Sequence, residues 1–197
     1  LRLKRDFLRH KTDTVILSVV PDTISRIVSV WKHYYEYGNT FGFKPRFVLK
    51  NNELQLIKNP IDDESKFYRY RDFLDEIRNN DFFYGKKFKK EKISFPYSIS
   101  VLKNARRNLS IIYWVYKINN LKKQNKDISA ISWNPNKIIM DINLKWRLEL
   151  FEDNNIRKLF RKIIEEYVSY SKINEFTPVF AFLPQKDDLL FIKTKNN

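Results

Sequence analysis

Two short apolar runs, each preceded by a helical pattern, limit the folds open to this chain more than any other feature. They are DTVILSVV (residues 13–20) and TPVFAFLPQ (residues 177–185). Neither run alternates as a half-buried strand does, which is typical of parallel strands covered by helices on both faces. A helix followed by a buried strand, found twice, predicts an α/β fold with a parallel sheet.

Helical patterns flank both runs. From Asp153 onward, apolar residues recur every three or four positions with charged residues opposite, which predicts an amphipathic helix before the second run. Residues 1–10, LRLKRDFLRH, are typical of the end of a helix before the first run. After that run, Asp22 can start a helix whose apolar residues recur as far as Tyr35, with an end near Gly38.

The loop from Val20 to Thr23 is the most site-like position in the sequence. It follows one buried strand and opens a helix. In open α/β sheets ligands collect at the carboxyl ends of the strands, and a helix N-terminus there offers free backbone N–H groups to an anion. We therefore expect this loop to line a binding site, although every strand-to-helix loop shares the same geometry.

Residues 41–61, FGFKPRFVLKNNELQLIKNPI, predict a β-hairpin. RFVLK and ELQLI alternate, and Asn51-Asn52 can adopt the positive φ angles of a tight turn. An isolated hairpin is marginally stable in water, so this one is expected to pack on the rest of the domain. Its expected role is a structural flap near the loop from Pro21 to Thr23.

The segment 62–149 differs in character and is expected to be a mainly helical insertion. Its first part mixes aromatic and charged residues. That mixture predicts either a surface that stacks bases or, more simply, an amphipathic helix followed by a basic loop at GKKFKKEK (85–92). A longer helix is expected over about 97–123, and Pro135 bars a continuous helix beyond it.

The residue inventory excludes several kinds of active site. The chain has no cysteine, so disulfides, thiolate metal sites and a cysteine nucleophile are absent. Its two histidines, His10 and His33, are expected to be surface or packing residues, so no metal site is predicted. It also lacks a glycine-rich phosphate loop, and no cofactor is expected. From its own residues the chain shows no complete active site.

Charge and hydropathy limit the kinds of partner that can be expected. The formal net charge of +15 would attract polyanions such as nucleic acid. The cations are scattered, however, and abundant Lys, Asn and Ile beside only three glycines is typical of a low-GC coding sequence, so nucleic acid is not the expected partner. No apolar run approaches the length of a membrane span. Because Leu1 is not a methionine and residues 1–10 do not resemble a signal peptide, we expect a piece of a longer protein of unknown compartment.

Three stretches, in order, resemble the middle of a subgroup of SGNH hydrolases, the GDSL-type esterases and acyl hydrolases. They are DTVILSVVPDTISRIV, WKHYYEYG and FKPRFVLKNNELQLIKNPI. The later helix and TPVFAFLPQKDD are similar to that family's penultimate helix–strand unit. The resemblance covers residues 1–61 and 150–190. It implies a single α/β domain with a three-layer, flavodoxin-like parallel sheet, incomplete in this chain, whose core is 1–61 and 150–197 and whose insertion is 62–149.

The family's catalytic residues are not found in this chain. The family uses a Ser in a Gly-Asp-Ser block, an oxyanion-hole Gly and Asn, and an Asp-x-x-His; neither the Gly-Asp-Ser nor the Asp-x-x-His occurs here, and no Asn stands at residues 21–23. The resemblance implies an ester hydrolase or acyltransferase acting on a small-molecule or carbohydrate ester, of which this chain is an inactive part. Asp22, Thr23 and Arg26 would lie near the substrate. The alternatives are a non-catalytic binding module, with a basic surface for a polyanion such as nucleic acid, or a pseudoenzyme.

Overall fold

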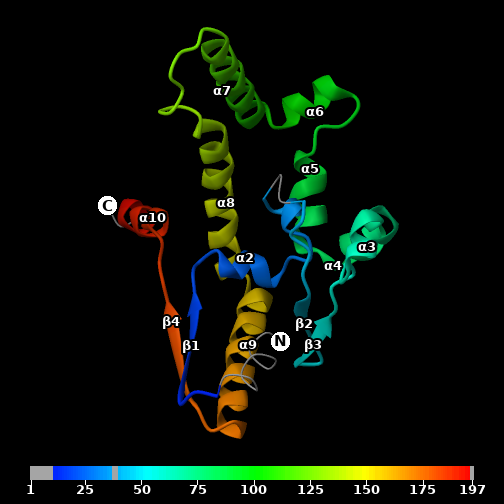
Figure 1. Ribbon diagram of the computed structural model, residues 1–197, viewed down its shortest axis with the longest axis vertical. Coiled ribbons are helices and arrows are strands. Elements are labelled where there is room, and N and C mark those ends of the chain that lie inside the picture. The colour runs from blue at the N-terminus through cyan, green and yellow to red at the C-terminus, as the bar shows by residue number, and fades with distance from the viewer. Residues whose placement is uncertain (1–10, 37–39, 196–197) are drawn as a thin grey trace.

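The computed structural model describes residues 11–36 and 40–195 of a mixed α/β molecule (Figure 1). The strands are β1 (Thr14–Val19), β2 (Arg46–Lys50), β3 (Glu53–Ile57) and β4 (Thr177–Phe182). The helices are α2 (Thr23–Ile27), α3 (Glu64–Tyr68), α4 (Leu74–Asn80), α5 (Lys89–Glu91), α6 (Tyr97–Lys103), α7 (Ala105–Lys123), α8 (Asn134–Glu152), α9 (Asn154–Ile173) and α10 (Lys186–Lys195). Shorter helical turns are η1 (Lys32–Tyr34), η2 (Tyr70–Phe73) and η3 (Tyr84–Phe88). Within the described ranges, none of these helices combines the length and the apolar character needed to cross a membrane.

Strands β1 and β4 pair in parallel, as the two apolar runs predict. The register sets Thr14 opposite Thr177. Helix α9 packs on one face of the pair, where Leu17 is partly buried. The other face carries Ile16, which is 61% exposed. The expectation that both faces would be buried is therefore wrong for β1, because no described helix packs over Ile16.

Helix α9 begins where the sequence predicts. The Asp153 carboxylate caps it by accepting hydrogen bonds from the backbone N–H groups of Asn155 and Ile156 at 2.8 and 3.2 Å. The helix stands between the parallel pair and the β-hairpin in Figure 1, and it contacts strands of both. The apolar face of α9 therefore packs against two parts of the molecule. Ile156 and Leu159 join the main core, and later residues face the parallel pair.

The Tyr167 hydroxyl joins α9 to both parallel strands. It donates to the Val15 carbonyl oxygen at 2.5 Å and accepts from the Val179 backbone N–H at 3.2 Å. Replacing Tyr167 with Phe removes this partner from both backbone groups, so we expect the free energy of unfolding to fall by about 1–2 kcal/mol in urea denaturation. Tyr68→Phe, at an exposed tyrosine, is the control. Equal stabilities of the two variants would contradict the bridging role.

Strands β2 and β3 form the predicted hairpin. Asn51 and Asn52 turn it with φ angles of 52° and 63°. The hairpin packs on α9, and its mouth approaches α2, where Lys44 Nζ donates to the Arg26 carbonyl oxygen. None of residues 41–61 lines the cleft beside the strand-to-helix loop that is described below. The expected flap over that loop is therefore not found.

The helix after β1 ends much earlier than its apolar spacing predicts, because α2 stops at Ile27. The cause is Asp81, which follows α4. One oxygen of its carboxylate, Oδ2, accepts hydrogen bonds from the Ser29 hydroxyl at 3.1 Å and from the backbone N–H groups of Val30 and Trp31 at 2.7 and 3.0 Å. These N–H groups are therefore withdrawn from a continuing helix.

The other Asp81 oxygen, Oδ1, accepts from the backbone N–H groups of residues 83–84 at 2.8 and 3.2 Å. Burial raises the pKa of Asp81, and four of its five donors, all except the Tyr84 N–H, oppose that effect. Beside it, Arg46 Nη1 donates to the carbonyl oxygens of Val28 and Asn80 at 2.5 and 3.0 Å. A carboxylate and a guanidinium thus close the junction between the end of α2, the hairpin and the end of α4.

The run 85–92, expected to be a basic loop, is mostly helical instead, within η3 and α5. Lys87 is 1% exposed. Its Nζ donates to the Tyr35 carbonyl oxygen at 3.2 Å and lies 3.2 Å from Glu91 Oε2, which Arg107 Nη1 also approaches at 2.7 Å. The run is therefore partly internal: one of its lysines belongs to a buried ion-pair cluster.

Helices α6 and α7 occupy the predicted long helix, with a break at Asn104. The sequence analysis missed α8, whose first turn contains Pro135. The proline begins this helix, because its missing N–H is not needed in a first turn. Helix α8 runs from the α7 end of the molecule to α9 and contacts α2, α7 and α9 (Figure 1). The insertion is thereby packed directly on the α/β part.

Candidate functional site

A cleft of about 590 Å³ opens at the carboxyl ends of β1 and β4. Val20, directly after β1, and Gln185, shortly after β4, both line it, together with residues of α8. Ligands collect at this position in open parallel sheets. Its lining includes Asp22, Arg26, Lys32, Tyr35, Asn143, Arg147 and Asp187.

The structure brings two of the three predicted site residues into this cleft. Asp22 and Arg26 line it, and Thr23 does not. The Thr23 hydroxyl instead accepts a hydrogen bond from the backbone N–H of Val20 at 3.3 Å. Thr23 therefore shapes the loop, and its hydroxyl is already used within the fold.

Asp22 is nearly buried and is held by two side chains. Arg26 Nε donates to its Oδ2 at 3.0 Å, and the Tyr35 hydroxyl donates to its Oδ1 at 3.0 Å. Burial raises the pKa of Tyr35, and the Asp22 carboxylate raises it further, so the phenol stays a protonated donor at neutral pH. A phenol and a guanidinium thus orient the Asp22 side chain in the cleft.

The start of α2 offers no free N–H groups to an anion. The backbone N–H groups of residues 23–26 donate to the carbonyl oxygens of Val20, Pro21 and Asp22 at distances from 2.8 to 3.3 Å. The loop closes on itself as a tight turn, so that its donors are used internally. The free N–H groups expected at this helix N-terminus are therefore not found among residues 23–26.

Helix α8 supplies polar groups that the sequence analysis missed. Arg147 Nη1 donates to Gln185 Oε1 at 3.0 Å, and its Nη2 lies 3.2 Å from Asp188 Oδ1. Asp188 also accepts from the Gln185 backbone N–H at 3.1 Å. Both charged side chains are largely buried. Arg147 thus ties α8 to the segment that leaves β4 and fixes that side of the cleft.

Two buried atoms on α8 have no hydrogen-bond partner among the described residues. They are the donor Nε of Arg147 and the acceptor Oδ1 of Asn143, and both residues line the cleft. Buried polar atoms are normally paired, and each unpaired one costs about 1–3 kcal/mol. Both atoms are closed to solvent, so a ligand in the cleft would reach them only if these two side chains turned toward it. These two residues could not be predicted as site residues, because α8 itself was not predicted.

The residues described around the cleft do not form a catalytic set. The one described histidine, His33, packs against the rings of Trp31 and Phe88 at 4.8 and 5.3 Å and is not part of the cleft lining. Burial lowers the pKa of His33, and the charge of Lys92 adds to this. These contacts agree with the predicted packing role, while His10 lies outside the described residues. Within the described ranges there is also no group of three side chains able to hold a metal ion.

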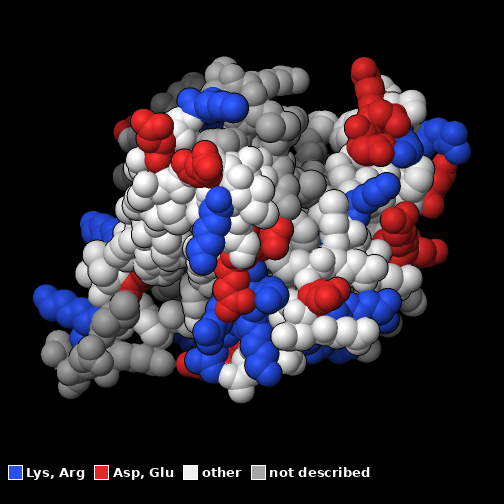
Figure 2. Space-filling view, turned by 90° about the horizontal axis from the view of Figure 1, so that it is seen from below, with Lys and Arg blue, Asp and Glu red and all other residues white. Residues whose placement is uncertain are grey.

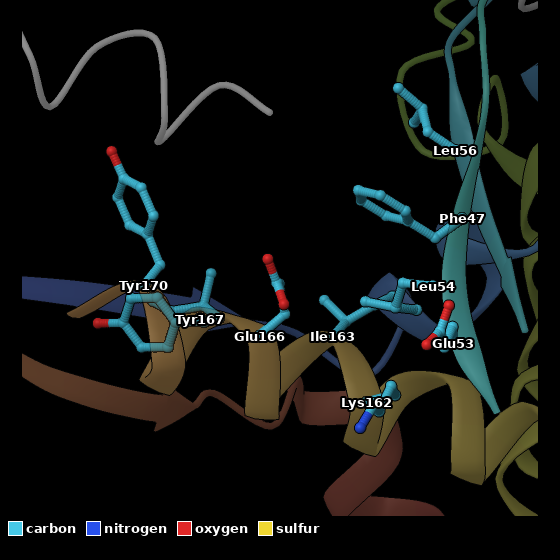
Figure 3. Close-up of a pocket in the computed structure, with 10 residues that line it drawn as sticks. Phe47, Glu53, Leu54, Leu56, Lys162, Ile163, Glu166, Tyr167 and Tyr170 are labelled. Atoms are coloured by element: carbon cyan, nitrogen blue, oxygen red, sulfur yellow. The ribbon is translucent and has the colours of Figure 1, made fainter. Parts of the chain in front are cut away.

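A second cavity, of about 570 Å³, lies between α9 and the hairpin (Figure 3). Phe47 and Leu56 project from the hairpin toward it, and Ile163 and Tyr170 project from α9. Its lining is mainly apolar, and the Tyr167 hydroxyl at its edge is already bonded to the strands. Glu53, Lys162 and Glu166 also line it. The cleft at the strand ends is the stronger candidate because ligands collect at that position in open parallel sheets.

The charge distribution does not favour a nucleic-acid track on the face seen in Figure 2. Lys and Arg are interspersed there with Asp and Glu. On α9, for example, Glu165 pairs with Arg161 at 3.1 Å and with Lys162 at 3.3 Å. A nucleic-acid site is normally a continuous basic stripe, and this face does not present one.

The sequence matches no model of a known protein family, and no significant match was found among curated proteins or solved structures. The resemblance to SGNH hydrolases therefore stays a prediction. A function for this chain has to be argued from the cleft itself.

Proposed function

We propose that this chain is part of an SGNH-like ester hydrolase or acyltransferase, and that the cleft at the ends of β1 and β4 receives its substrate. The observation that carries the proposal is the position of this cleft at the carboxyl ends of β1 and β4, with Asn143 and Arg147 in its lining. Once these side chains turn into the cleft, an ester carbonyl can accept from the guanidinium, and a sugar hydroxyl can donate to the amide oxygen. A small-molecule or carbohydrate ester offers both kinds of group.

The pair of parallel strands, β1 and β4, is consistent with a larger, three-layer sheet in the complete protein. Parallel sheets are almost always covered on both faces, whereas Ile16 is exposed and the described pair has two strands. Further strands beside β1 and a second helix layer over Ile16 would complete the flavodoxin-like arrangement that the resemblance implies. The nucleophilic Ser and the Asp-His pair would come from flanking sequence.

Binding is the first test, because it does not need the nucleophile. Glucose 6-acetate, an ester that keeps free sugar hydroxyls, is expected to raise the melting temperature of the 197-residue chain. Asn143→Ala is expected to abolish that rise, since it removes the acceptor in the cleft wall. Asn119→Ala, at an exposed position of α7, is the matched control and should keep the rise. Each variant is compared with its own unliganded melting temperature, and an unchanged rise in Asn143→Ala would refute the cleft as the site.

Turnover is the second test. The 197-residue chain should hydrolyse p-nitrophenyl acetate no faster than a heat-denatured control, because the described residues contain no nucleophile–base pair at the cleft. Turnover that persists through purification would contradict the proposal that catalytic residues come from elsewhere. A Gly-Asp-Ser upstream and an Asp-x-x-His downstream in the coding sequence would support it, and their absence would favour the pseudoenzyme.

A further inference from the structure

The segment 92–126, here named the basic arm, contains no acidic residue. It includes α6 and α7, which lie together at the end of the molecule away from the hairpin and α9 (Figure 1). One of its cations, Arg107, is paired with Glu91. The others form no ion pair among the described residues. All eight cations are Lys92, Lys103, Arg106, Arg107, Lys117, Lys122, Lys123 and Lys126.

Helix α7 exposes an apolar stripe. Leu109, Ile112, Tyr113 and Tyr116 follow the spacing of one helix face, and they are 51–67% exposed. The opposite face is the one that packs, since Ile118 is buried and α7 contacts α8. An apolar stripe on a helix usually faces a core. Here more than half of each of these side chains is exposed instead, and only Ile112 also borders a pocket shared with other elements.

Helix α6 and the residues before it extend the same character. Phe95, Tyr97, Ile99 and Leu102 are all exposed by more than half. On α7, the Lys117 ammonium lies 5.2 Å from the centre of the Trp114 ring and so borders the aromatic residues of the arm. Aliphatic side chains, aromatic rings and cations are thus presented together, without any carboxylate to oppose a negative surface.

We propose that the basic arm docks on an anionic lipid surface, with the α7 stripe inserted among the head groups. Interfacial helices combine an apolar face, aromatic rings and lysines in this way. A second copy of the chain is disfavoured as the occupant, because two arms would bring like charges together. Binding of nucleic acid would explain the exposed cations and aromatic rings of the arm, but it would not explain the exposed aliphatic side chains of Leu109 and Ile112.

Co-sedimentation with vesicles tests the proposal. The chain is expected to bind vesicles made of phosphatidylglycerol and phosphatidylcholine in equal parts, to bind phosphatidylcholine alone at least ten-fold more weakly, and to release as salt is raised. The double variant Leu109→Glu/Ile112→Glu should weaken binding at least ten-fold. Ile173→Glu/Leu189→Glu, at exposed positions on α9 and α10, adds the same two negative charges away from the arm and should retain binding.

The possible results distinguish a lipid surface, a second copy of the chain and nucleic acid as the occupant of this surface. Equal binding by Leu109→Glu/Ile112→Glu and the control Ile173→Glu/Leu189→Glu would overturn the inserted stripe, and so would no binding to anionic vesicles at low salt. Self-association without vesicles that Leu109→Glu abolishes would show that a second copy covers the stripe. Single-stranded oligonucleotide binding in the absence of vesicle binding would assign the arm to nucleic acid. Circular dichroism of each variant confirms that the helices are retained.

Discussion

Replacing Asp81 with alanine is expected to destabilise the protein by more than about 4 kcal/mol, which is a large share of a typical domain's stability. The carboxylate serves four backbone N–H groups and the Ser29 hydroxyl. Alanine leaves those buried donors without their acceptor, and each unpaired one costs about 1–3 kcal/mol. Urea denaturation followed by circular dichroism measures the change.

Two further variants sharpen the Asp81 prediction. Asp75→Ala, at a 90% exposed carboxylate on α4, is the control and should change stability by less than about 0.5 kcal/mol. Asp81→Asn keeps one acceptor but points an amide NH₂ at N–H donors, so it should cost about 2–3 kcal/mol. If Asp81→Ala were as stable as Asp75→Ala, the carboxylate could not be what ends α2.

Glu91→Ala is expected to cost about 3–4 kcal/mol, because it leaves the buried Lys87 ammonium without its carboxylate. Lys87→Met is expected to cost less than about 1.5 kcal/mol, because Arg107 still neutralises Glu91 and methionine fills the lysine's volume. The two unfolding free energies, measured at pH 7 in urea, should therefore differ clearly. Equal losses would mean that the cluster does not act through charge balance.

The Glu91 variant should also respond to pH in a defined direction. Burial lowers the pKa of Lys87, and Glu91 opposes that shift. Without Glu91 the folded-state pKa falls further below the unfolded value of about 10.4. The penalty is then full below the folded-state pKa and shrinks as pH rises toward the unfolded pKa. A destabilisation that stays constant from pH 7 to pH 10 would contradict this mechanism.

Local patterns were enough to predict the parallel pair, the hairpin turn at Asn51-Asn52 and the start of α9 at Asp153. Each depends on residues close in sequence: an apolar run, two residues that tolerate positive φ, or a capping carboxylate. The early end of α2 could not be predicted in this way, because Asp81 acts on Val30 and Trp31 across about fifty residues of sequence. The burial of Lys87 could not be predicted from local patterns either, because it depends on the groups that its ammonium contacts in the folded chain.

The candidate site was predicted in position but not in composition. The rule for parallel sheets located the loop after β1, and Asp22 and Arg26 do line a cleft there. The polar atoms that most need a ligand belong to Asn143 and Arg147, on a helix that the pattern did not reveal. Free N–H groups at the loop were wrongly expected, because a turn of this tightness bonds its own carbonyl oxygens.

Helix α8 also sets a length scale for the molecule. Its 19 residues make a rod of about 28 Å, with Asn143 near the middle and its first turn beside the end that carries α7. The cleft lining follows this rod from Trp133 and Asn136 at its first turn to Arg147. If the basic arm lies on a membrane, the cleft therefore begins at the end of α8 that is nearer the arm. An ester carried on a lipid-linked head group could then enter the cleft from that end.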